Sequence, residues 1–268
     1  MGIRAVARRL GRRLDGMASL PVLGGLYDRY FATASGNVRL FRGVYPDFDS
    51  ARASAPATKP LGYDNDASAL RLEGELHQVF PTDYPVMFWM QKLIQERSVI
   101  FDFGGNVGIS FFNFKPYFAY PDGMKWIVCD VPAVAAAGAA LAKDEGASQL
   151  AFVTDCEGVG EADIYLASGV LQYVEDPFRS LREAARRPRH VLINRTSVLD
   201  VESAVTLQSI GTSFCPYHLF NRKEFLSNFS DLGYRLVDEW KNPGHGCRIP
   251  AHSKYNIDEY SGFYFVLE

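Results

Sequence analysis

SVIFDFGGNVG, residues 98–108, is the most informative stretch of this sequence. Its apolar residues predict a buried strand that ends at Asp102, and a glycine-rich loop follows at once. In α/β proteins, such a loop between a strand and a helix brings backbone N–H groups next to a bound nucleotide. Glycine suits the loop because a Cβ would collide wherever the backbone takes a positive φ or touches the ligand. The loop glycines are Gly104, Gly105 and Gly108.

Two acidic residues favour a cationic nucleoside over a dinucleotide as the ligand. Asp102 lies beside the glycines, where a carboxylate would repel the pyrophosphate of a dinucleotide. It would attract S-adenosylmethionine (SAM), which carries an ammonium and a sulfonium group and no phosphate. Asp130 ends the next apolar strand, 22 residues after Gly108, where a carboxylate can accept hydrogen bonds from both ribose hydroxyls. The glycine loop and the two carboxylates together predict a SAM site.

From residue 98 onward, apolar strand patterns alternate with helical patterns, which predicts a parallel sheet covered by helices on both faces. No helical pattern separates the last two strands, so at least one of them should run antiparallel. The expected strands are 98–103, 125–129, 150–154, 163–167, 190–194, 234–240 and 262–267. The expected helices are 107–118, 132–144, 177–187 and 222–232.

We interpret residues 1–97 as an N-terminal extension of a domain that covers residues 98–268. Within the extension, residues 43–66 are rich in Pro, Ala, Ser and Asp and predict an extended connection with turns. Residues 67–97 predict helix, interrupted by prolines. This segment has apolar residues to bury and no strand of its own, so we expect it to form a lid over the crevice at the strand ends. The alternative is that it packs on the back of the sheet.

The composition predicts a reduced, cytoplasmic protein with a large core. The chain has 268 residues, 47% of them hydrophobic, and a net charge of −3 that gives no pull toward nucleic acid. Four cysteines without a C-x-x-C pair indicate neither a zinc ribbon nor a redox centre. No apolar run is long enough to span a membrane. Residues 1–14 interleave arginines with apolar residues and could lie on the inner membrane surface, or form a solvated terminal helix.

The order of elements over residues 98–268 resembles the class I SAM-dependent methyltransferases. The resemblance implies an α/β fold: a Rossmann-like seven-stranded, mostly parallel sheet with helices on both faces and the last strand antiparallel. More narrowly, the chain resembles a family of mostly uncharacterised bacterial methyltransferases. One departure from the general D-x-G-x-G-x-G loop is Asn106 in place of the middle glycine, and Asn tolerates left-handed backbone. The matching motifs are Asp102–Gly108, Asp130–Pro132, Ala167–Tyr173 and Ile193–Arg195, with 43–45 and 62–65.

The resemblance implies which residues bind the cofactor. The glycine loop and Asp102 should hold the methionine part, and Asp130 the ribose, with Val131 near the adenine. Residues after the third strand should contact the adenine ring, although Asp155 there could equally be a turn residue. Residues after the fourth strand lie where ligands gather in open α/β sheets. The expected cofactor residues are Asp102, Gly104, Gly105, Gly108, Asp130, Val131, Asp155, Cys156, Ser168 and Gly169.

The catalytic residues are less evident, because methyl transfer from a sulfonium requires orientation more than acid–base help. His218 is the best candidate for a base, since its pKa lies near neutrality, and a structural histidine is the alternative. Tyr173 could line the acceptor site or belong to the core. Arg195 could bind an anionic acceptor or pair with Asp200 or Glu202.

We expect residues 168–173, 194–195 and 212–218 to form the acceptor site, roofed by 67–97. The predicted reaction is methyl transfer to an oxygen or nitrogen atom of a small molecule or glycan. The alternatives are a nicotinamide-dependent (NAD) oxidoreductase, against which Asp102 counts, and a SAM-binding module without catalysis. Basic charge clusters only near the N-terminus, so nucleic acid is a poor acceptor candidate. No metal site is expected, and the sequence identifies neither the acceptor nor the oligomeric state.

Overall fold

The computed structural model describes residues 21–268, except 37, 65–75 and 156. Its larger sheet has seven strands in the order β10-β11-β6-β5-β2-β3-β4. The strands from β6 to β4 in this order are parallel, whereas β11 is antiparallel to both of its neighbours. This confirms the predicted Rossmann-like fold class. The strands are β2 (Val99–Phe103), β3 (Lys125–Cys129), β4 (Leu150–Val153), β5 (Ile164–Ser168), β6 (His190–Thr196), β10 (Tyr234–Asn242) and β11 (Tyr260–Leu267).

Helices cover both faces of this sheet, because alternate strand residues are apolar on both sides. Ile100 and Trp126 face one helical layer, and Phe101 and Tyr165 face the other. The first layer consists of α5 (Tyr84–Leu93), α6 (Ile109–Phe114) and α7 (Pro132–Asp144). The second consists of η2 (Glu157–Glu161), α8 (Arg179–Glu183) and α9 (Arg222–Asp231).

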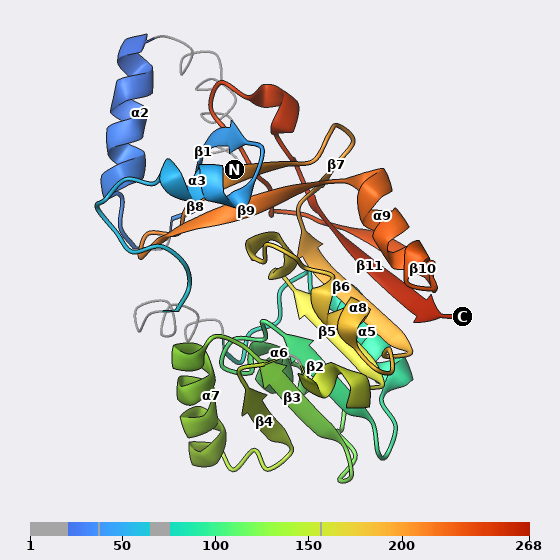
Figure 1. The fold of residues 1–268 in the computed structure, drawn as a ribbon. Helices are drawn as coiled ribbons and strands as arrows, with labels where there is room; N and C mark the ends of the chain where they lie inside the picture. Colours follow the sequence, from blue (N-terminus) through green and yellow to red (C-terminus); the bar gives the residue numbers. More distant parts are fainter. Residues whose placement is uncertain (1–20, 37, 65–75, 156) are drawn as a thin grey trace.

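A second, four-stranded sheet lies beyond the carboxyl ends of the parallel strands (Figure 1). Its order is β1-β8-β9-β7, so β1 from the N-terminal region pairs with a strand of residues 197–221, the insert between β6 and α9. The sequence did not predict the strands of this insert. Helices α2 (Pro21–Thr33) and α3 (Phe48–Ala53) pack on the outer face of the small sheet. The strands are β1 (Leu40–Tyr45), β7 (Val198–Leu199), β8 (Ala204–Ser209) and β9 (Phe214–Asn221).

Several expected helices are shorter in the structure. The helix expected over 67–97 covers only 84–93 of the described residues, after turns at 76–83. Its buried residues Val86 and Met90 pack in the core against the face of the sheet, so α5 itself is not a lid over the strand ends. Proline explains the start of α5, since Pro85 occupies its first turn. The division at residue 98 stays a prediction.

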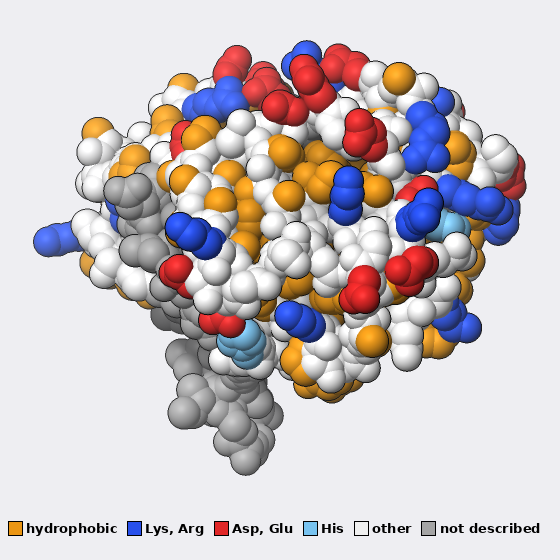
Figure 2. Space-filling model, turned by 90° about the horizontal axis from the view of Figure 1, so that it is seen from below, with side chains coloured by type: hydrophobic (Ala, Val, Ile, Leu, Met, Phe, Trp, Pro, Cys, Tyr) orange, Lys and Arg blue, Asp and Glu red, His pale blue; other side chains and the backbone are white. Residues whose placement is uncertain are grey.

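The described surface carries charges of both signs. Lys, Arg, Asp and Glu side chains surround hydrophobic ones on the face shown in Figure 2. Among the described residues, no helix is long and apolar enough to span a bilayer. The basic segment 1–14 lies outside the described residues, so its expected membrane contact stays a prediction.

Candidate active site

The glycines of the loop after β2 leave no space for a Cβ. Gly104, Asn106 and Gly108 all have positive φ, at 67°, 55° and 89°. A Cβ at Gly104 would lie 2.2 Å from the Val170 side chain, and one at Gly105 would lie 2.5 Å from the carboxylate of Asp102. Asn106 therefore adopts the left-handed backbone expected of it. The loop can present its backbone directly to a ligand.

Asp130 holds this loop in place from the end of β3. Its Oδ2 accepts a hydrogen bond of 2.9 Å from the Asn106 N–H, and its Oδ1 accepts one of 2.8 Å from the Val131 N–H. Burial raises the pKa of Asp130, although these hydrogen bonds oppose the shift. Each carboxylate oxygen can accept a further hydrogen bond, so Asp130 remains able to bind a ribose hydroxyl.

Asp102 is a fully buried carboxylate under the loop. Its Oδ2 accepts a hydrogen bond of 3.0 Å from Trp126 Nε1, and its Oδ1 has no partner among the described residues. Burial raises the pKa of Asp102 to about 7. A buried carboxylate with an unpaired oxygen fits a nearby cation better than a nearby phosphate. These residues therefore fit the cationic cofactor that the sequence predicts.

The other expected cofactor residues have local structural roles as well. Asp155 is exposed, and its Oδ1 accepts a hydrogen bond of 3.1 Å from the Glu157 N–H, the turn role that was the alternative. Cys156 lies outside the described residues. Gly169 has a φ of 76° and donates its N–H to the Asn194 carbonyl at 2.8 Å. Their contacts with the adenine or the methyl group stay predictions.

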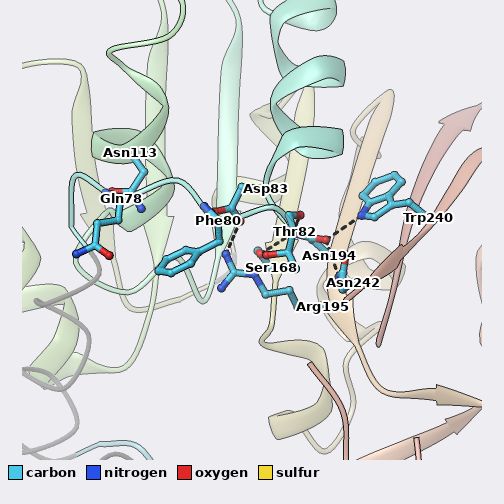
Figure 3. Close-up of polar contacts among 10 residues, drawn as sticks. All are labelled: Gln78, Phe80, Thr82, Asp83, Asn113, Ser168, Asn194, Arg195, Trp240 and Asn242. Carbon is cyan, nitrogen blue, oxygen red and sulfur yellow. Dashed lines mark hydrogen bonds and ion pairs between the residues drawn. The ribbon is translucent and has the colours of Figure 1, made fainter. Parts of the chain in front are cut away.

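Asn194, at the end of β6, organises the rim of the sheet (Figure 3). It is fully buried, and its Nδ2 donates to the Thr82 carbonyl at 3.0 Å and to Ser168 Oγ at 3.3 Å. Its Oδ1 accepts from Trp240 Nε1 at 3.0 Å and from Asn242 Nδ2 at 2.9 Å. The sequence did not predict this network because its members are far apart in the chain. The only local signal was the motif Ile193–Arg195.

Arg195 pairs with Asp83 and not with the acids of the insert. Arg195 has a positive φ of 53°, and its side chain reaches the turn before α5. Asp83 in that turn is almost fully buried and also accepts a hydrogen bond of 2.9 Å from the Phe80 N–H. Glu202, one of the predicted partners, pairs instead with Lys254. The expected pairing with Asp200 or Glu202 is therefore wrong, whereas a role of Arg195 in binding an anionic acceptor stays a prediction.

His218 and Tyr173 lie on opposite sides of the small sheet. The His218 ring packs 4.5 Å from the Phe48 ring on the outer face, and its Nε2 lies 3.1 Å from the Glu175 carbonyl. Burial lowers the pKa of His218. Tyr217 next to it points to the inner face and meets Tyr173 edge-on, with ring centroids 5.0 Å apart. Segments 168–173 and 212–218 thus meet through these tyrosines, and the geometry gives His218 no access to the inner face.

Residues 60–64 form a strap that connects the small sheet to the start of α7. It bonds to the start of β9, where the Gly62 N–H donates to the Phe214 carbonyl at 2.9 Å. The Tyr63 ring then meets Tyr173 at 5.6 Å. Asp64 Oδ1 accepts a hydrogen bond of 3.2 Å from the Ala133 N–H at the start of α7. The extended connection expected over 43–66 is wrong in part, because residues 48–53 form α3 and residues up to 45 belong to β1. Its last residues instead pack beside Asp130, which their sequence did not predict.

No family model and no curated protein matches this sequence. Solved structures match it at low identity. A Haloferax volcanii protein described as a methyltransferase, in complex with the Trm112 methyltransferase activator, is 14% identical, with a TM-score of 0.51 over 77% of this chain and 97% of that one. The 1,6-didemethyltoxoflavin-N1-methyltransferase of Burkholderia thailandensis is 17% identical, with a TM-score of 0.48 over 70% and 79%. The N-terminal domain of EvdMO1, solved with S-adenosylhomocysteine (SAH) and D-fucose, is 12% identical, with a TM-score of 0.46 over 71% and 84%. At 14% identity, the likeness to the Haloferax volcanii protein shows the methyltransferase fold and no more.

Proposed function

We propose that this protein is a SAM-dependent methyltransferase that acts on an oxygen or nitrogen atom of a small-molecule or glycan acceptor. The observation that supports this best is the buried carboxylate of Asp102, with one unpaired oxygen, under a loop whose glycines leave no space for a Cβ. A dinucleotide would bring phosphate charge beside that carboxylate, whereas SAM brings a cation. The Haloferax volcanii neighbour, described as a methyltransferase, agrees with the proposal.

The protein's own residues would bind and orient the reactants. SAM, when bound, supplies a methyl group that is already activated, so orientation is the main requirement. Asp130, fixed by two backbone N–H groups, would accept hydrogen bonds from the ribose. Backbone N–H groups of the glycine loop would hold the methionine part, and Ser168 and Gly169 would face the transferred group. Tyr173 would contact the acceptor from the neighbouring 3-10 turn η3 (Leu171–Tyr173).

The N-terminal extension would exclude water from this crevice. The strap 60–64 bonds to the start of α7, and Thr82, in the turns at 76–83, bonds to Asn194 of β6. The ion pair between Asp83 and Arg195 fixes the second of these segments. A closed site keeps the sulfonium and the acceptor in line and prevents their separation by water.

A ligand titration of the full chain tests the cofactor. SAM and SAH should raise the melting temperature, and NAD should not. A ligand at about 100 times its dissociation constant adds about 2.7 kcal/mol of stability, which is readily measured as a thermal shift. Stabilisation by NAD without stabilisation by SAM would favour the oxidoreductase. Radiolabelled methyl transfer to a panel of metabolites and glycans then separates an enzyme from a SAM-binding module.

We also propose that the protein is cytoplasmic and contacts the inner membrane surface through residues 1–14. Five arginines at helical spacing among apolar residues support this proposal. Co-sedimentation of the full chain with vesicles containing anionic lipid tests it. Deletion of residues 1–14 should abolish the co-sedimentation, and equal sedimentation of both forms would contradict the proposal.

A further inference from the structure

The inner face of the small sheet faces the proposed acceptor site and carries one arginine. Phe41 of β1 lies on this face, where its ring meets Tyr217 edge-on at 5.2 Å. Arg39 lies one residue before β1 and two before Phe41, so continued alternation of the chain puts it on the inner side with Phe41. Arg42 points the other way, because it lies over the Phe31 ring of α2 at 5.0 Å and within 3.9 Å of Asp28.

Arg39 carries a positive charge that the described part of the protein does not neutralise. The residue is exposed, and among the described residues it makes no ion pair or hydrogen bond. Burial raises the pKa of the Tyr173, Tyr217 and Tyr260 hydroxyls well above the usual value. The charge of Arg39 acts on the same three hydroxyls and opposes this shift, but its effect is smaller. Burial therefore keeps these phenols neutral, and none of them compensates Arg39.

Three carboxylates lie on the cofactor side: Asp102 and Asp130 end neighbouring strands, and Asp64 adds a third beside α7. Arg195, the basic residue at the rim, is already paired with Asp83. Arg39 thus remains an uncompensated cation, and its charge reaches Tyr173.

We infer that the acceptor carries an anionic group, a carboxylate or a phosphate, which Arg39 binds while the acceptor ring lies against Tyr63 and Tyr173. This inference rests on the proposed function, because it assigns a substrate class to that site. A guanidinium binds either group through two parallel hydrogen bonds. Tyr63 and Tyr173 are both half-buried and meet edge-on at 5.6 Å, so each keeps ring surface for a sugar or an aromatic ring.

The test compares probes that differ in charge, using the full chain saturated with SAH. The probes are D-glucuronate and glucose 1-phosphate, each against D-glucose, and 4-hydroxybenzoate against 4-hydroxybenzyl alcohol, measured by calorimetry or ligand-observed NMR. At least one anion should bind about tenfold or more tightly than its neutral partner, as expected for a charge-assisted hydrogen bond. Arg39→Gln should remove this preference, and Arg39→Lys should restore part of it. Arg29→Gln, at an exposed arginine of α2, is the matched control and should retain it.

The same experiment separates this inference from the proposed function. SAH should bind wild type and Arg39→Gln equally, because Arg39 lies on the acceptor side. Equal binding of all charged and neutral probes, or a preference that survives Arg39→Gln, would overturn the inference while SAH binding upholds the cofactor site. Absence of SAH binding to the wild type would overturn both. A preference for glucose 1-phosphate alone identifies phosphate as the bound group, and a preference for the acids alone identifies carboxylate.

Discussion

Replacing Asp102 with asparagine should stabilise the folded protein above neutral pH. Folding raises the pKa of this carboxyl from 3.8 to about 7. A raised carboxyl pKa means that the folded state holds the proton more tightly, so the group lowers stability progressively from about pH 4 to pH 7. At 1.36 kcal/mol for each pH unit, the full cost is about 4 kcal/mol, of which about 3 kcal/mol develops above pH 5. The asparagine side chain cannot ionise, yet its amide oxygen can still accept the Trp126 hydrogen bond.

Urea unfolding of both proteins at pH 5 and pH 8 measures this effect. The stability advantage of Asp102→Asn should grow by about 3 kcal/mol between the two pH values. Asp144→Asn, an exposed carboxylate at the end of α7, is the control and should show no such growth. The variant should also lose affinity for SAM, because the amide offers no charge to the cation. A constant stability difference at both pH values would refute the argument that a buried, unpaired carboxylate is maintained here at a cost to the fold.

Three further substitutions test other parts of the site. Asp130→Ala should weaken SAM binding by about 1.5–3 kcal/mol in calorimetry, since a charged acceptor of ribose hydrogen bonds is lost. An unchanged affinity would show that Asp130 does not bind the ribose. Gly104→Ala should abolish SAH-induced thermal stabilisation, because its Cβ would lie 2.2 Å from Val170 in a left-handed backbone. Asn194→Ala should destabilise the fold by about 2–4 kcal/mol in urea, as its buried partners lose their hydrogen bonds. Asn194→Ala with wild-type stability would show that the network contributes nothing.

The central sheet was predictable because its signals are local. Strands β2 to β6 begin and end within two residues of the expected positions, since each is a short apolar run between turn residues. Helix α7 matches its expected bounds because Pro132 marks its start. The glycine loop and the two strand-end aspartates were predictable for the same reason, as each lies next to its own strand.

The small sheet and the rim network were not predictable, because they depend on contacts between distant segments. Strand β1 finds its partner β8 far along the chain, and nothing in its own six residues specifies that pairing. The charge of Arg195 is neutralised by Asp83, from a turn more than 100 residues earlier, whereas acids near it in sequence were the natural guess. His218 and Tyr217 look equally available in sequence, and only the pairing of β9 decides which face each takes.

The pairing of β1 with β8 sets an order of events during synthesis. Leu40 pairs with Ser209, so β1 leaves the ribosome long before its partner exists. Strands β2, β3 and β5 can pair as soon as residue 168 has emerged, and the cofactor half can begin to fold while β1 is still a lone strand with an exposed Phe41. Closing so large a loop is slow, and unpaired strands invite association with other chains. Changes that weaken the β1–β8 pairing should therefore appear first as aggregation of newly made protein, and only later as altered chemistry at the acceptor side.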